Sequence, residues 1–354
     1  MESCADMALK LTSLAALAAL PFDEIIDVRA PSEYAEDHIP GAINLPVLSD
    51  DERAIVGTIY VQQDRFLARK TGAALVARNA AAHLEGPLAD KDGGWRPLIY
   101  CWRGGQRSGS FASILAQVGW RVDLIEGGYK SYRRLVVGAL YDDPLPHRLI
   151  LLDGGTGTAK TRLLARLAEA GAQVIDLEAM AAHRGSLLGG RPGGQPAQKA
   201  FESRLAMALA RLDPARPVFL EAESNKIGRL ILPPSLWQAM MAADHVTLDA
   251  PLAARARYLC RAYADLLADA DLLCSKLAPL KTYHGAERVA LWQDMARGGD
   301  FEALAADLVE RHYDPRYIKA QSRQGRAPLT RITLGGLEDA ELDAALGQII
   351  AAAG

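Results

Sequence analysis

The fold of the second half of this chain follows from residues 149–161, LILLDGGTGTAKT. The four apolar residues predict a buried strand, the glycine-rich run predicts a loop, and the residues from Lys160 onward predict a helix. Further short apolar runs end near Asp176, Glu221 and Leu248. Strands that alternate with helical stretches are typical of a parallel α/β sheet, so we expect that architecture here.

The glycine-rich run predicts a phosphate site. It resembles the P-loop pattern G-x-x-x-x-G-K-[ST], except that Ala159 stands where the pattern has glycine. In such loops the amides surround a di- or triphosphate, the lysine neutralises it and the hydroxyl holds Mg²⁺. We therefore expect Gly154, Gly157, Lys160 and Thr161 to bind phosphate. The methyl of Ala159 is expected to crowd the phosphate or to resist the required backbone angles. The sequence therefore predicts the fold more strongly than it predicts nucleotide hydrolysis, and a diphosphate is a candidate ligand.

Two carboxylates stand at the ends of later strands in this half. Asp176 and Glu221 each follow an apolar run, where P-loop proteins present a carboxylate to Mg²⁺ or water. They are candidates to bind a metal or a diphosphate. A helix-capping or surface role is an equal alternative.

The first half shows the same alternation and predicts another parallel α/β domain. Its apolar runs lie at 24–28, 98–101 and 122–125, and its helical stretches at about 63–84, 108–118 and 129–140. The segment DDPLP, residues 142–146, carries two prolines and two acids and is typical of a linker. We therefore expect one domain at 12–141 and a second at 147–354, with helices dominating after Pro251.

Residues 100–108, YCWRGGQRS, predict a second anion-binding loop between a strand and a helix. Backbone amides and a helix N-terminus at such a position lower a thiol pKa and favour the thiolate. Cys101 is therefore a candidate nucleophile, with Arg103 and Arg107 as catalytic partners and Gly104 and Gly105 as phosphate-binding residues. The alternative is a small buried residue at a strand end, which would not need two glycines and two arginines after it.

The same loop also fits C-x5-R-S, the pattern of cysteine phosphatases, in which the arginine clamps a phosphate. A phosphatase usually has histidine before the cysteine, where this chain has Tyr100, and no acid is evident to protonate a leaving alcohol. We therefore expect phosphate binding beside a cysteine that accepts sulfur or selenium.

Length, charge and cysteine content exclude several classes of protein. The chain has 354 residues and a formal net charge of −3, which fits two domains but not a globally basic nucleic-acid binder. The apolar run at 11–20 is too short to cross a membrane, and Glu2 and Asp6 precede it where a signal peptide has net positive charge, so we expect an N-terminal helix and no membrane partner. Four cysteines without a CxxC pair predict no structural metal and a reducing cytoplasm. They are Cys4, Cys101, Cys260 and Cys274.

Motifs upstream of the cysteine loop resemble those of a rhodanese domain. They are Asp27-Val28-Arg29, Glu33-Tyr34 and residues 38–44, HIPGAIN. The resemblance spans most of residues 22–140 and implies that Cys101 is the sulfur-carrying residue. It gives Asp27, Arg29 and His38 a fold-supporting role.

Nearly the whole chain resembles tRNA 2-selenouridine synthase, a rhodanese domain joined to a P-loop domain. The runs that carry this resemblance are 101–105, 126–130, 176–178, 183–186, 198–202, 221–228 and 312–317. It implies a transferase that converts wobble 2-thiouridine in tRNA to 2-selenouridine, with selenophosphate as the selenium donor. It also implies an S-geranyl-2-thiouridine intermediate made from geranyl diphosphate.

This resemblance gives each loop a role. Cys101 would carry selenium as S-selanylcysteine while Arg103, Arg107 and the loop amides hold the departing phosphate. We assign geranyl diphosphate to the loop from Gly154 to Thr161, where Lys160 and a Mg²⁺ cofactor would offset the charge of leaving pyrophosphate. Selenophosphate synthetase is a candidate partner.

A tRNA substrate requires a basic surface. Between positions 101 and 134 six basic residues stand against two acidic ones, a balance that suits contact with RNA phosphates. Trp102 is a candidate to stack on an extruded wobble base, with core packing as the equal alternative. The candidate tRNA-contacting residues are Trp102, Lys130, Arg133, Arg134 and Arg184.

Two other functions remain open. One is a rhodanese-type sulfurtransferase or cysteine phosphatase with a P-loop regulatory domain, which would turn over thiosulfate or a phosphomonoester. The other is a noncatalytic tRNA- or nucleotide-binding adaptor in which Ala159 marks an inactive loop. The adaptor would tolerate Cys101→Ser, whereas selenium transfer requires the thiol.

Overall fold

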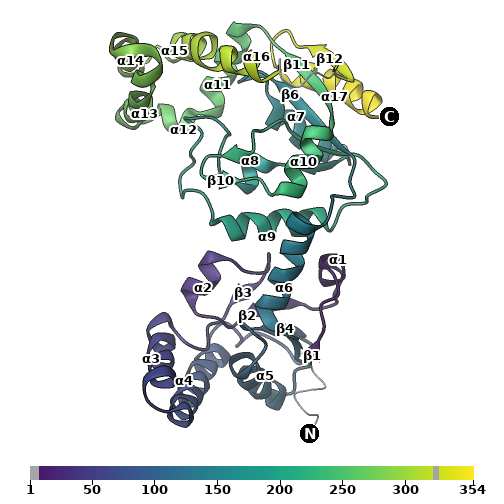
Figure 1. The fold of residues 1–354 in the computed structure, drawn as a ribbon, viewed down its shortest axis with the longest axis vertical. Helices are drawn as coiled ribbons and strands as arrows, with labels where there is room; N and C mark the ends of the chain where they lie inside the picture. Colours follow the sequence, from purple (N-terminus) through teal and green to yellow (C-terminus); the bar gives the residue numbers. More distant parts are fainter. Residues whose placement is uncertain (1–7, 322–326) are drawn as a thin grey trace. The chain divides into compact units, whose positions relative to one another are not determined.

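The computed structural model describes residues 8–321 and 327–354, so Cys4 lies outside the described residues (Figure 1). The chain divides into two compact units: unit 1 comprises residues 1–144 and 196–211, and unit 2 comprises 145–195 and 212–354. We expected a continuous second domain at 147–354, but helix α9 (Gln198–Leu209) belongs to unit 1. The reason is packing, because its buried residues, among them Phe201 and Leu205, lie against other helices of unit 1.

Unit 1 contains a five-stranded parallel sheet in the order β1-β5-β4-β2-β3. The strands are β1 (Ala8–Leu9), β2 (Glu24–Asp27), β3 (Ile43–Asn44), β4 (Pro97–Tyr100) and β5 (Asp123–Ile125). The expected strands β2, β4 and β5 are confirmed, whereas β1 and β3 have only two residues each and leave no apolar pattern. Since the strands are parallel, their carboxyl ends share one edge, and β4 ends there directly before Cys101.

Helices lie on both faces of this sheet (Figure 1). The helices of unit 1 are α1 (Leu14–Ala18), α2 (Pro31–Glu36), α3 (Asp50–Gln62), α4 (Arg65–Glu85), α5 (Gln106–Val118), α6 (Gly128–Val137), the π-helical turn η1 (Gly138–Asp142) and α9. Ser49 and Glu52 begin α3 with a reciprocal capping box. We did not predict α3, because none of its residues is buried and the helix therefore carries no apolar stripe.

Unit 2 contains a second parallel sheet, in the order β12-β11-β6-β8-β7, which confirms the expected α/β architecture. Its strands are β6 (Leu149–Gly154), β7 (Gln173–Ile175), β8 (Val218–Glu221), β11 (Asp244–Asp249) and β12 (Thr330–Thr333), and β9 (Lys226–Ile227) and β10 (Leu230–Ile231) form a separate hairpin. The central strand β6 leads into the glycine loop, so the loop lies at the carboxyl edge of the sheet, where ligands bind in α/β folds.

The helices of unit 2 form two groups, with separate apolar cores beside the sheet and among the helices after Pro251. The helices are α7 (Lys160–Glu169), α8 (Leu177–Met180), α10 (Pro234–Ala242), α11 (Leu252–Ala262), α12 (Ala264–Leu267), α13 (Ala270–Leu277), η2 (Ala278–Leu280), α14 (Lys281–Gly298), α15 (Phe301–Leu308), η3 (Val309–Tyr313), α16 (Asp314–Gln321) and α17 (Asp339–Ala353). In Figure 1, α13, α14 and α15 lie together at one end of this unit. Within the described ranges, no helix is long and apolar enough to cross a membrane.

Candidate functional site

The thiol of Cys101 lies between the end of β4 and the start of α5. Its Sγ accepts hydrogen bonds from the Gly105 amide at 3.4 Å and from the Ser108 hydroxyl at 3.2 Å. Burial alone would raise the pKa of this thiol, yet the hydrogen bonds from Ser108, Gly105 and the Arg103 amide bring the pKa below its ordinary value. The loop therefore favours a thiolate, as expected of a nucleophile.

Backbone amides at the N-terminus of α6 hydrogen-bond to the cysteine loop. The Tyr129 amide donates to the Cys101 carbonyl at 2.8 Å and the Lys130 amide donates to the Trp102 carbonyl at 3.1 Å. Gly128 has a φ of +58°, and a Cβ atom there would lie 2.3 Å from the Cys101 carbonyl oxygen. Only glycine permits this approach, which explains the glycine at position 128 of the run EGGYK, residues 126–130.

The two arginines of the cysteine loop differ in their availability. Arg103 is exposed. Arg107 forms an ion pair with Glu33, in which its guanidinium donates a hydrogen bond to the carboxylate at 2.8 Å. A phosphate would have to displace Glu33 to be clamped by Arg107, so the structure differs here from the predicted phosphate clamp. The sequence could not show this, because Glu33 lies 74 positions away.

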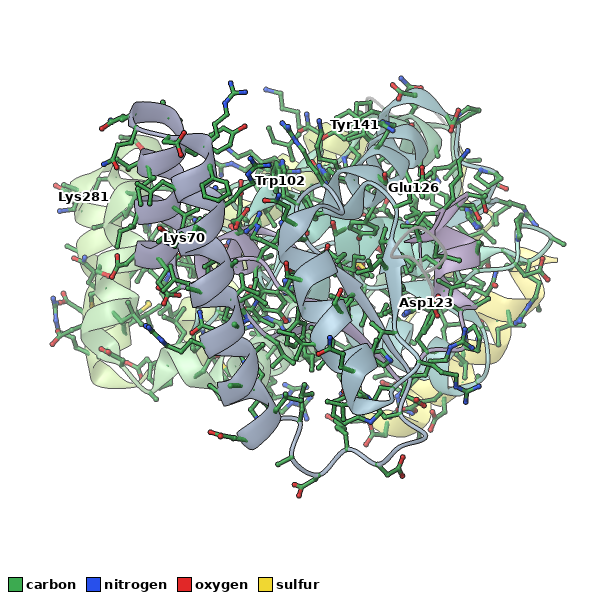
Figure 2. All side chains as sticks on the ribbon, turned by 90° about the horizontal axis from the view of Figure 1, so that it is seen from below. Lys70, Trp102, Asp123, Glu126, Tyr141 and Lys281 are labelled. Carbon is green, nitrogen blue, oxygen red and sulfur yellow. The ribbon has the colours of Figure 1, made fainter. Side chains whose placement is uncertain are left out.

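Aromatic rings and a buried ion pair pack beside the loop. Trp102 is half-buried and stacks on Tyr129 with ring centroids 5.2 Å apart (Figure 2 labels Trp102). The Arg29 guanidinium lies 4.1 Å from the Tyr129 ring and is paired with the buried carboxylate of Asp27. Asp27 and Arg29 thus support the fold, and one face of Trp102 is already covered by Tyr129.

Two of the four candidate tRNA-contacting cations are engaged in ion pairs. Arg133 pairs with the buried carboxylate of Glu202 on α9. Arg184 pairs with Asp265 at 2.6 Å and lies over the Tyr263 ring. We therefore remove Arg133 and Arg184 from the tRNA-contacting set. Lys130 and Arg134 are exposed and remain in it.

The glycine loop turns directly into α7, as the sequence predicts. Lys160 Nζ donates to the carbonyls of Gly154 at 2.7 Å and Gly155 at 3.3 Å, so it lies against the loop. Ala159 adopts a left-handed conformation with a φ of +61°. Its methyl packs in the core of unit 2, so Ala159 accepts the required backbone angles without exposing its side chain.

Four carboxylates lie at or just after the ends of the strands β7 and β8. They are Asp176, Glu178, Glu221 and Glu223. Thr161 donates a hydrogen bond to Glu178 at 3.3 Å. Burial and the neighbouring Glu178 raise the pKa of Glu223 to about 7. We did not predict Glu178 or Glu223 as site residues, although each lies two positions after Asp176 or Glu221.

The geometry of Asp176 and Glu221, the two carboxylates predicted to bind a metal or a diphosphate, does not suit a metal ion. Asp176 caps α8 by accepting the Ala179 amide at 2.7 Å. Glu221 is fully buried, and burial together with Asp176 raises its pKa well above the ordinary value. Within the described part of the chain, no three His, Cys, Asp or Glu side chains are grouped to hold a metal ion. We therefore derive no step through Mg²⁺.

Both units match known family models. Residues 11–135 match the Rhodanese-like domain, and residues 147–288 match the tRNA 2-selenouridine synthase AAA domain.

Proteins named tRNA 2-selenouridine synthase from several bacteria are similar to this chain. The protein from Nitrosomonas europaea is 38% identical over 235 residues, which cover 65% of this chain and 61% of that protein. The protein from Shewanella loihica is 34% identical, covering 83% and 86% of the two chains. The protein from Pseudomonas fluorescens is 33% identical, covering 90% and 93%. The chain therefore spans less than two thirds of the first of these relatives and most of the other two.

Proposed function

Because the chain belongs to the tRNA 2-selenouridine synthase family, we propose that it replaces the sulfur of wobble 2-thiouridine in tRNA with selenium. The observation that carries this proposal is the Cys101 thiol, whose pKa is lowered by hydrogen bonds from Ser108 and two amides. Such a group is a nucleophile at neutral pH. The proposed selenium donor is selenophosphate, which an enzyme such as selenophosphate synthetase would have to supply.

The proposed first step prepares the thiouridine for exchange. Its sulfur attacks C1 of geranyl diphosphate, the C–O bond breaks and pyrophosphate leaves. The amides of the glycine loop, the N-terminus of α7 and Lys160 support this assignment, because they would stabilise the charge that develops on the diphosphate.

The proposed second step uses Cys101. Its Sγ–Se bond forms as the Se–P bond of selenophosphate breaks, giving S-selanylcysteine. Water supplies the fourth oxygen of the phosphate that leaves. The selenium is oxidised by two electrons in this step, and a disulfide accepts these electrons. The selenium then adds to C2 of the uridine, geranyl thiol leaves, and a second thiol returns the two electrons by cleaving the Se–S bond. We propose that Arg103 and the loop amides hold the phosphate, and the exposure of Arg103 supports this role.

The phosphatase alternative lacks support from the geometry, because Arg107 is paired with Glu33. Exposed Lys130 and Arg134, together with Arg103, are the cations that we propose contact tRNA.

Mass spectrometry of tRNA nucleosides tests this function. Cells that lack the protein are complemented with the wild type, Cys101→Ser or Lys160→Ala. We expect Cys101→Ser to accumulate S-geranyl-2-thiouridine without 2-selenouridine, and Lys160→Ala to retain 2-thiouridine. Persistent 2-selenouridine in cells without the protein would refute the assignment. Normal geranylation by Lys160→Ala would refute the role of the glycine loop.

A further inference from the structure

Helices α11, α12, α13 and α15 of unit 2 line a partly open cavity of about 60 Å³. This volume has room for about four water molecules. Its wall is apolar, and its large side chains include Leu259, Leu266, Phe301, Leu304 and Leu308. We call this cavity the chain pocket.

The chain pocket adjoins the glycine loop. Thr156, within that loop, is part of the pocket wall. Leu259 packs against the loop as well, since a Cβ atom on Gly157 would lie 3.0 Å from Leu259 Cγ. The same leucine therefore contacts the loop and lines the cavity, so a ligand whose phosphates lie on the loop has an apolar cavity beside it.

The tyrosine hydroxyls in the pocket wall are already engaged. The hydroxyl of Tyr263 shares a hydrogen bond with the Ser186 hydroxyl at 2.8 Å. The side chain of Tyr313 also interacts with Ser186 through a hydrogen bond. A nucleobase buried here would leave its polar edge without these partners, which disfavours binding. A hydrocarbon chain has no such requirement.

We propose that the chain pocket holds the isoprenoid chain of a prenyl diphosphate whose head group lies on the glycine loop. This inference rests on the proposed function and names the site of its prenyl donor. Each buried methylene contributes about a fourfold gain in affinity. Because the cavity is small, an isoprenoid chain enters from its open side and displaces wall side chains as it lengthens.

Two alanines on α15 provide a matched test. Ala305 lines the pocket and is half-buried, whereas Ala303 is exposed and does not line it. Titration calorimetry measures binding of geranyl diphosphate and of inorganic pyrophosphate to the full chain. We expect Ala305→Phe to weaken geranyl diphosphate binding roughly tenfold or more, the effect of losing about two buried methylenes. Pyrophosphate binding should be unchanged, and Ala303→Phe should alter neither.

A chain-length series on the wild type keeps the inference testable if Ala305→Phe fails to fold. Affinity should rise from pyrophosphate to dimethylallyl to geranyl diphosphate. The pocket assignment is overturned if geranyl diphosphate binds tightly but Ala305→Phe has no effect, or if affinity is independent of chain length. If the wild type binds pyrophosphate and a nucleoside triphosphate but not geranyl diphosphate, the geranyl step of the proposed function fails as well.

Discussion

Arg255 and Asp314, 59 positions apart, form a two-point ion pair with N–O distances of 2.9 and 2.6 Å. The same guanidinium donates through Nε to the carbonyl of Thr156 in the glycine loop at 2.8 Å. Arg255 on α11, held by Asp314 on α16, thus fixes the position of the glycine loop through the Thr156 carbonyl. Asp314 belongs to the run HYDPRY at residues 312–317, and this contact gives that run a structural role.

Arg255→Lys should loosen the glycine loop. A lysine ammonium cannot make the two-point pair and bond Thr156 in the same geometry. We expect the free energy of unfolding to fall by about 1–3 kcal/mol, with weaker pyrophosphate binding. Urea unfolding and calorimetry measure the two effects. The control is Arg257→Lys on an exposed position of α11; an equal effect in the control would contradict this role of Arg255.

Ala159→Gly should leave stability almost unchanged. The left-handed conformation costs an alanine about 1–2 kcal/mol. Glycine relieves this cost but removes a buried methyl, which contributes about 0.8 kcal/mol, and adds about 0.5–1 kcal/mol of chain entropy to the unfolded state. We expect a change below about 1 kcal/mol in urea unfolding and unchanged pyrophosphate affinity, because the methyl packs in the core. Much tighter pyrophosphate binding would show that the methyl crowds the loop.

Ser108→Ala should make Cys101 less reactive. Losing a hydrogen bond to the thiolate raises the thiol pKa, so alkylation by iodoacetamide at neutral pH should slow roughly tenfold. The pH dependence of alkylation, followed by intact-protein mass, measures this change. Ser110→Ala, at an exposed position of α5, should react like the wild type. Unchanged pH dependence in Ser108→Ala would mean that its hydroxyl does not stabilise the thiolate.

Neighbouring arginines on α6 should separate fold support from tRNA contact. Arg133→Ala removes the ion-pair partner of the buried Glu202 carboxylate, which keeps only its hydrogen bonds from Tyr141 and Gln198, and we expect it to lower stability by about 3 kcal/mol. Arg134→Ala should change stability by less than about 0.5 kcal/mol. It should weaken tRNA binding and reduce the salt dependence of binding by about one phosphate contact. Filter binding at several salt concentrations measures this; the opposite pattern would restore Arg133 as the tRNA contact.

Glu223→Gln should remove a pH dependence of stability. Burial and Glu178 raise the pKa of Glu223 to about 7 in the folded chain, so between its ordinary value and pH 7 the folded chain keeps a proton that the unfolded chain has lost. Stability therefore falls as the pH rises through this range. Urea unfolding at pH 5 and pH 8 should show a smaller decrease for Glu223→Gln than for the wild type. Glu169→Gln, on exposed α7 surface, should retain the wild-type decrease.

Local sequence was sufficient to predict the strands and loops that form both proposed anion sites. Residues 97–108 and 149–161 each contain a strand, its loop and the start of a helix in one continuous segment. The amides proposed to surround an anion come from that same segment, so the local pattern is sufficient to indicate the candidate site. Helix α3 was missed because it buries no residue and has no periodic apolar face.

The availability of the charged side chains depends on partners that are distant in sequence. Arg107 and Arg133 look like free cations in the sequence, but the fold pairs them with Glu33 and Glu202. Arg134, next to Arg133, remains exposed, because adjacent positions on a helix point in different directions. Sequence alone thus determined where the two loops lie and that Cys101 and Lys160 belong to them. Tertiary structure decided which charges are available to a substrate, because an ion pair depends on distance in space and not along the chain.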